Sequence, residues 1–501
     1  MKNFLKNNNF IIFLLGLATS FSFSPLFLVF IPFFTFPYLF DKVFHAKNKL
    51  SAFLIGFIFS FGYFVGNLYW ISISLFTDIK AYWWLLPFAI SAIPACVAIF
   101  FGISCLCFYI FKTKSTTINV ILFASFWTIF EYLRSVMFTG LPWNLPVNCV
   151  TFSKILLQPI SILNSYGYSF ILMLLFLSKK FYKEKFFKFF IIFFIGLLIF
   201  SFVRIKIIGT KNKEINIRII QPNIPQVLKW DKDVERENFE KIINLSLSKG
   251  YEKVDYFIWP ESAITSVYYE KRDNSKLINE INDRLLKDKK TLISGIVSYD
   301  EEKLFNSLII LSGNKISGIY RKYFLVPFGE FVPLRKFFPF VSKITAGSLD
   351  YSRGEARQNL TTEDFIFSPN ICYESLFFNS VNNNSNLIIN VTNDGWFGKS
   401  TGPFQHFEHL KLRAVENNLP VIRVANSGIS GVINNFGETI IKTKLYKEEV
   451  IDIKLPYSDK KIKKISEGFI VIVLVLINLV LTTSQLLLQG TSSQNREGFR
   501  E

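Results

Sequence analysis

The sequence predicts a two-part protein: a multi-span α-helical membrane domain and an α/β domain whose sheet is covered by helices. Three observations support this. Half of the 501 residues are apolar and only 19% are charged, whereas soluble domains average about a quarter charged. Long uncharged runs fill the chain up to residue 205 and return near residue 468. Between them, short apolar strands alternate with charged helical stretches, which is typical of α/β domains.

The composition excludes several classes of protein. The chain is too apolar for disorder and too poor in Gly and Pro for a collagen-like fold. Of five cysteines, four lie in or beside the apolar N-terminal region and Cys372 stands alone in the polar part, so no disulfide scaffold is expected. The net charge is +18, but lysine clusters between apolar runs and the lack of nucleic-acid-binding motifs indicate membrane topology and no nucleic-acid partner.

Uncharged runs define the candidate spans, because a helix needs about 20 residues to cross the hydrocarbon core. The runs cover 10–40, 50–77, 81–111, 115–130, 155–178, 189–203 and 468–495. The first run fits either one long helix or a hairpin broken at Pro25. Lysines precede and follow it, so the positive-inside rule favours the hairpin. A cleaved signal peptide is the rival interpretation of the lysines near its start.

The hairpin leads to a definite topology. Residues 1–204 then form a membrane domain with about seven transmembrane helices, and 467–489 form a final one before a short cytoplasmic tail at 490–501. An odd number of spans places 205–466 on the periplasmic side of a bacterial inner membrane. Four lysines would lie on the outer side against the charge rule, where anionic lipid headgroups can accommodate them. They are Lys460, Lys461, Lys463 and Lys464.

The polar domain contains eight predicted strands and three predicted helices. The strands are Ile215–Ile220, Tyr256–Trp259, Thr291–Val297, Leu308–Leu311, Phe365–Ile371, Leu387–Val391, Val421–Ala425 and Val432–Asn434. The helices cover 233–249, 274–287 and Pro403–Asn417. Their alternation over about 260 residues indicates a single domain.

Three motifs with chemistry-bearing residues lie at the ends of strands, where α/β domains place their sites. Glu261 follows Trp259-Pro260, Lys322 precedes the segment PFGEFVP, and Cys372 ends an apolar strand. Taken singly, these residues have structural explanations: a solvated cap, a surface charge and an inert core thiol. The explanation of Cys372 as an inert core thiol is the weakest of the three, because Cys372 would be exported and oxidising compartments select against unpaired thiols without a function.

Together the motifs resemble the nitrilase, or carbon–nitrogen hydrolase, superfamily, whose Glu-Lys-Cys triad lies on an α-β-β-α sandwich. Six segments are similar to its membrane-bound branch, the apolipoprotein N-acyltransferase family. They are FTGLPWN (138–144), QPNIPQVLKW (221–230), WPES (259–262), RKYFLVPFGEFVPLR (321–335), CYES (372–375) and NDGWFG (393–398). The resemblance covers nearly the whole chain. Pro222 stands where the family is expected to have Gly, which affects a turn and not the triad.

The resemblance implies a two-step acyl transfer. An acyl chain would move from a phospholipid donor to Cys372 as a thioester, and then to the N-terminal amine of a diacylglyceryl-apolipoprotein acceptor. Glu261 would take the proton of the thiol, since a thiol becomes a strong nucleophile only as a thiolate. Lys322 would stabilise the tetrahedral oxyanion, a role worth about 3–4 kcal/mol for a single donor.

The family pattern also implies supporting residues. Glu330 would orient Lys322 or Glu261, Tyr373 and Glu374 would shape the pocket beside the nucleophile, and Trp230 matches a position tied to substrate binding.

No cofactor, metal site or nucleotide loop is expected. His406 and His409 lie three residues apart on a predicted helix, and the third histidine is His45 on the cytoplasmic side. Helix packing is therefore the expected role of the pair. The apolar segment 337–340 fits ordinary core as well as it fits a contact with lipid.

Two alternatives remain open from the residues alone. A membrane-anchored amidase that hydrolyses a small amide would use the same triad, although one anchor would suffice for a soluble substrate. A transporter with a decayed outer domain predicts intramembrane charges along a pathway, and only Glu131 and Arg134 come close.

Overall fold

The structure is a computed structural model that describes residues 8–207, 213–270, 275–333, 335, 349–457 and 466–497. The chain divides into two compact units. The first, here the helical unit, comprises Met1–Tyr69, Pro87–Val203 and Lys464–Glu501, and the second, the sheet unit, comprises Trp70–Leu86 and Arg204–Lys463. Trp70–Leu86 thus belongs with the sheet unit, although the sequence analysis assigned it to the membrane domain. The segment 337–340 and the lysines at 460–464 lie outside the described residues.

The helical unit is built from apolar helices. The main ones are α1 (Asn8–Thr19), α2 (Pro32–Phe44), α3 (Lys49–Leu68), α5 (Leu86–Phe111), α6 (Thr116–Val136), α8 (Ile160–Phe176), α10 (Lys185–Ile207) and α14 (Glu467–Glu497). Within the described residues, four stretches are long and apolar enough to cross a membrane, and three apolar helices are shorter. The first uncharged run forms two helices around Pro25, as the hairpin interpretation predicted. The total of eight crossings stays a prediction.

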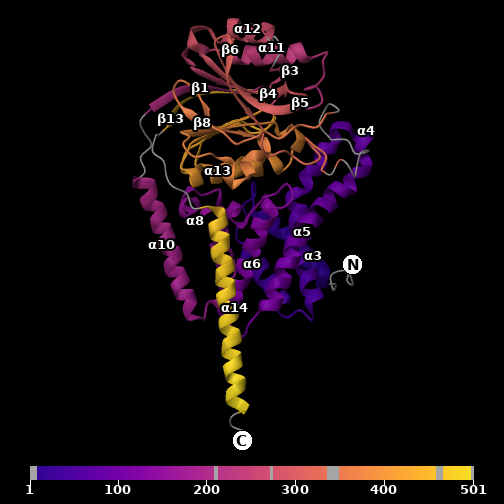
Figure 1. Cartoon of the computed structure of the whole chain (residues 1–501), viewed down its shortest axis with the longest axis vertical. Coiled ribbons are helices and arrows are strands. Elements are labelled where there is room, and N and C mark those ends of the chain that lie inside the picture. The colour runs from indigo at the N-terminus through magenta and orange to yellow at the C-terminus, as the bar shows by residue number, and fades with distance from the viewer. Residues whose placement is uncertain are drawn as a thin grey trace. The chain divides into compact units, whose positions relative to one another are not determined.

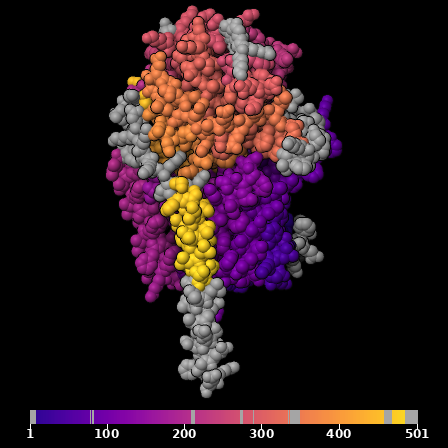
Figure 2. Space-filling view, in the orientation of Figure 1, coloured from indigo at the N-terminus to yellow at the C-terminus, as the bar shows by residue number. Residues whose placement is uncertain are grey.

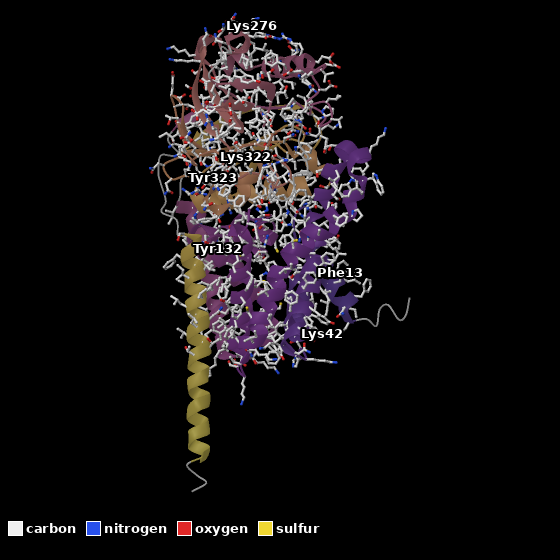
Figure 3. The ribbon with its side chains drawn as sticks, turned by 45° about the vertical axis from the view of Figure 1, so that its right-hand side comes forward. Phe13, Lys42, Tyr132, Lys276, Lys322 and Tyr323 are labelled. Atoms are coloured by element: carbon white, nitrogen blue, oxygen red, sulfur yellow. The ribbon has the colours of Figure 1, made fainter. Side chains whose placement is uncertain are left out.

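Small residues let α1 and α3 pack closely, as is common between membrane helices. A Cβ added to Gly16 would lie 1.8 Å from the carbonyl oxygen of Phe59. A Cβ added to Gly62 would lie 2.2 Å from the carbonyl oxygen of Phe13, whose side chain is labelled in Figure 3. Neither glycine can therefore be replaced unless the two helices move apart.

The C-terminal helix α14 packs against α6 and α8, although it follows them in sequence by hundreds of residues. It runs beside the other helices of its unit in Figures 1 and 2 (yellow). The hydroxyl of Ser125 donates a hydrogen bond of 3.4 Å to the carbonyl oxygen of Leu474. Asn164, whose φ of 52° marks a kink in α8, donates one of 3.4 Å to the carbonyl oxygen of Ser466.

Glu131 and Arg134, the two charges that the transporter alternative pointed to, form a buried ion pair near the end of α6. Arg134 contacts the carboxylate of Glu131, which also accepts a hydrogen bond from the indole of Trp127 at 3.2 Å. Arg134 further donates to the carbonyl oxygen of Trp143 at 2.9 Å. The pair thus ties the helix to the loop that carries FTGLPWN, which gives both charges a structural role.

The sheet unit contains two sheets. The first has the order β13-β1-β2-β4-β5-β6, with β3 also paired to β4, and the second has the order β12-β11-β10-β9-β8-β7. The strands of the first are β1 (Lys213–Gln221), β2 (Tyr256–Ile258), β3 (Ile264–Tyr269), β4 (Thr291–Asp300), β5 (Lys303–Ser312), β6 (Lys315–Arg321) and β13 (Glu449–Tyr457). Those of the second are β7 (Leu360–Thr361), β8 (Ile366–Ile371), β9 (Leu387–Thr392), β10 (Val421–Ala425), β11 (Gly431–Ile433) and β12 (Thr439–Lys442).

The sheets and helices of this unit form four layers, as Figure 1 shows. One apolar core lies between the sheets and joins Ile217 of β1 to Phe367 of β8. A second packs α11 (Glu235–Ser246) and α12 (Ser275–Leu285) on the outer face of the first sheet. A third packs α13 (Gly402–Asn417) on the outer face of the second sheet. The predicted α-β-β-α sandwich is confirmed, with all eight predicted strands and all three predicted helices in place.

Candidate active site

Glu261 lies just beyond β2 in a tightly constrained turn. Glu261 is only 7% exposed, and the next residue, Ser262, has a φ of 47°. A Cβ added to Gly295 on β4 would lie 2.6 Å from the Cα of Glu261, so only glycine fits there. Left-handed backbone at a non-glycine residue costs about 1–3 kcal/mol and is concentrated at functional sites.

Lys322 follows β6 and lies inside the sheet unit, whereas Lys276 on α12 lies at its surface (Figure 3). Its ammonium donates to Glu330 Oε1 at 3.0 Å and to Glu261 Oε1 at 3.4 Å. Burial lowers the pKa of Lys322, but the carboxylates of Glu330 and Glu261 outweigh that effect and hold the pKa above its usual value. Lys322 is therefore a fixed cation shared by two carboxylates.

Asn306 on β5 completes this group. Its amide nitrogen donates to Glu261 Oε1 at 2.8 Å and to Glu330 Oε1 at 2.7 Å. The other oxygen of Glu330 accepts a hydrogen bond from the backbone nitrogen of Val326 at 2.9 Å. We call Glu261, Asn306, Lys322 and Glu330 the carboxylate cluster.

Cys372 directly follows β8 and has a φ of 52°. Burial raises the pKa of its thiol to about 12, and the charge of Glu261 acts in the same direction, while Lys322 opposes it. The thiol thus interacts electrostatically with both residues that the sequence analysis paired with it. At rest it is protonated, so it needs a base before it can act as a nucleophile.

Glu374 connects the segment beside Cys372 to the loop that carries Lys322. Its carboxylate accepts hydrogen bonds from Ile371 N at 2.8 Å, Tyr320 Oη at 2.7 Å and Tyr323 N at 2.8 Å. Burial raises its pKa despite these donors. Tyr323 is labelled beside Lys322 in Figure 3.

Two further residues of the expected site are half-buried. Tyr373 packs edge-on against Phe377, with 5.2 Å between the ring centroids. Trp230 lies in the turn after β1, two sequence positions beyond the exposed Leu228.

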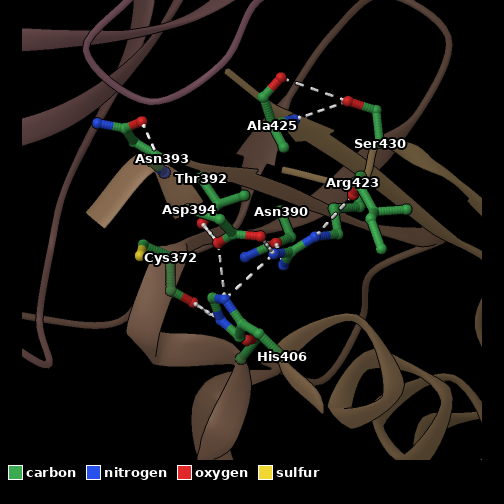
Figure 4. A network of polar contacts seen from close by, with 12 residues as sticks. Cys372, Asn390, Thr392, Asn393, Asp394, His406, Arg423, Ala425 and Ser430 are labelled. Carbon is green, nitrogen blue, oxygen red and sulfur yellow. Dashed lines mark hydrogen bonds and ion pairs between the residues drawn. The ribbon is translucent and has the colours of Figure 1, made fainter. Parts of the chain in front are cut away.

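A second polar group contacts the backbone of Cys372, as Figure 4 shows. His406 on α13 has its Nε2 3.2 Å from the carbonyl oxygen of Cys372 and 3.0 Å from the hydroxyl of Ser375. Its Nδ1 lies 2.9 Å from Asp394 Oδ1. Arg423 on β10 donates to Asp394 Oδ2 at 2.6 Å and to Asn390 Oδ1 at 2.7 Å. We call His406, Asp394, Arg423 and Asn390 the His406 network.

The charges of the His406 network balance. Burial raises the pKa of Asp394, but Arg423 and His406 outweigh it and hold that pKa well below its usual range. Burial, followed by the charge of Arg423, lowers the pKa of His406. The network is therefore an anionic carboxylate paired with a guanidinium, beside an imidazole that stays neutral near pH 7. His406 contributes more than the helix packing expected of it.

Sequence analysis missed Asn306, Asp394, His406 and Arg423 as members of the site. One signal was available for one of them, because Arg423 interrupts a strand that is otherwise apolar. A buried polar side chain on such a strand needs a partner. Among the described residues, no group of three His, Cys, Asp or Glu side chains is arranged to hold a metal ion.

Comparisons with known proteins match both units. The model of the apolipoprotein N-acyltransferase N-terminal domain matches residues 15–178, and that of carbon-nitrogen hydrolase matches residues 216–459. The apolipoprotein N-acyltransferase of Rickettsia prowazekii (strain Madrid E) is 37% identical over 462 residues, or 88% of this chain and 91% of that protein. The protein of the same name from Brucella suis biovar 1 is 29% identical, over 88% and 87% of the two chains. Saccharomyces cerevisiae Nit3, of the nitrilase superfamily, gives a TM-score of 0.39 at 19% identity, over 50% of this chain and 92% of that one.

Proposed function

The chain belongs to the apolipoprotein N-acyltransferase family, and from this membership we propose that it transfers a fatty acyl chain from a membrane phospholipid to an apolipoprotein. It is accordingly an acyltransferase of lipoprotein maturation. The proposed acceptor atom is the α-amino nitrogen of the diacylglyceryl-cysteine that begins the apolipoprotein, and the proposed nucleophile is Cys372.

The observation that carries this mechanism is the convergence of three distant motifs. Glu261 and Lys322 are 61 positions apart in the sequence, yet their side chains lie within 3.4 Å, and both interact electrostatically with the thiol of Cys372. All three residues are buried. Such an acid, cation and thiol have the roles that covalent acyl transfer requires.

In the first step, Glu261 takes the proton of the thiol, and the thiolate attacks the carbonyl carbon of the phospholipid ester. Lys322 donates to the tetrahedral oxyanion. The carbon–oxygen bond to glycerol then breaks, and the glycerol oxygen leaves with the proton that Glu261 had taken. The products are an acyl thioester on Cys372 and a lysophospholipid.

In the second step, the amine of the acceptor attacks the thioester. Glu261 takes one proton from the amine nitrogen, the carbon–sulfur bond breaks, and that proton returns to the thiolate. The products are an amide-linked lipoprotein and the free thiol.

The other residues of the site support this reaction. Glu330 orients Lys322 toward Glu261, and Glu374 fixes the nucleophile against the loop after β6. Tyr373 and Trp230 are proposed to contact the substrates, since both are half-buried and border buried members of the site.

The helical unit fits a membrane-bound substrate. Removing a diacyl lipid from the bilayer costs about 0.8 kcal/mol per CH₂ group, so the thiol must be reached from the bilayer. We propose the inner membrane as the location, with the sheet unit on the periplasmic side. The domain boundaries at 1–204, 205–466, 467–489 and 490–501 belong to this proposal, except that Trp70–Leu86 groups with the sheet unit.

Labelling tests the topology. In a Lys276→Cys variant, the new thiol lies at the surface of α12, and an impermeant reagent should label it in intact spheroplasts. Labelling only after lysis would place the sheet unit in the cytoplasm instead. The parent chain, with its five native cysteines, is the matched control.

A covalent intermediate tests the chemistry. Incubation with phospholipid and no acceptor should leave one acyl chain on Cys372 and release a lysophospholipid, and neutral hydroxylamine should cleave the linkage. Cys372→Ala should abolish the label, and Cys372→Ser should trap a stable oxyester. Label that persists in Cys372→Ala, or that maps to another cysteine, contradicts the mechanism.

The same assay separates the amidase alternative. The acyltransferase should hold its thioester in water and discharge it when a lipid-anchored amine is added, because its site should exclude water from the thioester. A hydrolase would turn over readily without the amine.

A further inference from the structure

One buried cation of the sheet unit has no part in the mechanism above. Lys229 lies in the turn after β1 and is only 3% exposed. Its ammonium donates a hydrogen bond of 2.8 Å to the backbone carbonyl oxygen of Glu261. Desolvating an ammonium is costly, so a buried one needs compensation from hydrogen bonds or opposite charges.

The turn that carries Lys229 is itself anchored. Ile224 N donates to Asn426 Oδ1 at 3.0 Å, and Asn426 Nδ2 donates back to the carbonyl oxygen of Ile224 at 2.8 Å. Asn393 Nδ2 donates to Gln226 Oε1 at 2.7 Å. These bonds join the turn to the loops after β9 and β10, so the backbone holds Lys229 at Glu261.

Apart from Lys229, the charges that act on the thiol are those of two carboxylates and one lysine. Glu261 and Asp394 raise the pKa of Cys372, and Lys322 lowers it. Burial lowers the pKa of Lys229 to about 8, and the two groups that act in the opposite direction are Glu261 and Cys372. Lys229 thus interacts electrostatically with both the donor and the acceptor of the proposed proton transfer, Cys372 and Glu261.

We propose that Lys229 is a positioning residue of the acyl-transfer site, which holds the base Glu261 through its carbonyl and supplies a second positive charge to the anion formed at Cys372. When the thiol proton moves to Glu261, negative charge moves from the carboxylate to the sulfur and then to the oxyanion. A cation near both Glu261 and Cys372 stabilises the negative charge at each of these stages. Lys322 supplies less of this stabilisation because its charge is shared with Glu330. The oxyanion part of the inference rests on the function proposed above.

Alkylation of Cys372 tests the charge without any acyl transfer. The full chain in detergent would be treated with iodoacetamide, and mass spectrometry of the peptide containing Cys372 would give the rate at each pH. Lys229→Met should slow alkylation about tenfold at neutral pH, because loss of a nearby cation raises the pKa of a thiol by about one unit. Lys229→Arg should keep a rate near that of the parent chain, because a guanidinium stays charged.

Lys290 provides the matched control. It is also a buried lysine of the sheet unit, and its ammonium donates to the carbonyl oxygens of Tyr251, Glu252 and Val254 at 3.2, 3.0 and 2.6 Å. Lys290→Met should lower the melting temperature and leave the alkylation rate of Cys372 unchanged. An equal slowing in Lys290→Met would mean that any buried lysine has this effect, and would overturn the proposal.

The pH dependence sharpens the test. As pH rises through about 8, Lys229 loses its proton, so the parent chain should lose its advantage over Lys229→Met and the ratio of their rates should fall toward one. The groups facing Lys229 that also titrate are Glu261 and Cys372, and both are present in both chains. A ratio of one at every pH would refute the role of Lys229, whereas a chain that alkylates as expected but forms no thioester would refute only the proposed function.

Discussion

The carboxylate cluster and the His406 network both act on Cys372, and both are buried sets of ionisable groups. They differ in charge balance. The carboxylate cluster holds two carboxylates around one lysine, whereas the His406 network pairs one carboxylate with one guanidinium. A group with excess negative charge can accept a proton during a reaction, and a balanced group cannot without losing its main contact. We therefore expect the carboxylate cluster to take part in proton transfer and the His406 network to hold the backbone at Cys372 in place.

Glu261→Gln should have the largest effect, because it removes the base and keeps the shape. We expect release of lysophospholipid to fall by about 10³-fold, within the range of general acid–base catalysis. Glu240→Gln is the matched control, since Glu240 lies on α11 and pairs with Arg236 and Arg284. Parent-like turnover in Glu261→Gln would make Glu261 a structural cap.

Asp394→Ala should disrupt the His406 network and lower the stability of the fold. Arg423 is fully buried, and removing the carboxylate of Asp394 leaves the charge of Arg423 uncompensated, which costs about 3–5 kcal/mol. The free energy of unfolding should fall by that amount in a denaturant titration. Glu214→Ala removes a partner of the exposed pair with Lys454 and should cost less than about 1 kcal/mol. A small loss in Asp394→Ala would show that the network does not support the fold.

Substitutions of Asn306 test whether the net charge of the carboxylate cluster matters, because Asn and Asp differ in charge and hardly in shape. Asn306→Ala removes the amide donor shared by Glu261 and Glu330 and should lower turnover about tenfold. Asn306→Asp replaces the donor with a third carboxylate, so it should be the more damaging change. Equal losses from the two variants would mean that the charge of the carboxylate cluster does not matter.

His406→Gln should have the smallest effect. It removes the contact between the imidazole and the carbonyl oxygen of Cys372, and one such hydrogen bond is worth about 0.5–1.5 kcal/mol. We expect kcat to fall about three- to tenfold with KM unchanged, since the substrate-facing residues are untouched. His409→Gln, on the same helix, is the control and should leave kcat at the parent value.

Much of the fold was predictable because its central strands are short apolar runs between turns. The strands that the sequence analysis missed lie mainly toward the sheet edges. Residues 449–457 of β13 and 439–442 of β12 carry charged or exposed side chains, because an edge strand buries fewer of them. The pairing of β13 with β1 depends on contacts between residues more than 200 positions apart, which no local pattern indicates.

The candidate site was predictable where the residues lie in family motifs. The side chains of Glu261, Lys322 and Glu330 lie in contact, and Cys372 is coupled electrostatically to the first two, while the triad itself stays a prediction. The partners of these residues were not predictable. Asn306 and His406 act through contacts between distant elements, and their sequence neighbours do not reveal those contacts.

The packing of α14 against α6 and α8 has a consequence for the order of synthesis. Ser125 and its partner Leu474 are 349 residues apart, so a ribosome adding about 5–20 residues per second reaches the second roughly 20 to 70 seconds after the first. During that interval the surface of α6 that receives α14 lacks its partner, while Arg204–Lys463 of the sheet unit is made. The helical unit therefore begins folding first and is completed last, and any occupant of that surface in the meantime must leave before α14 can pack there.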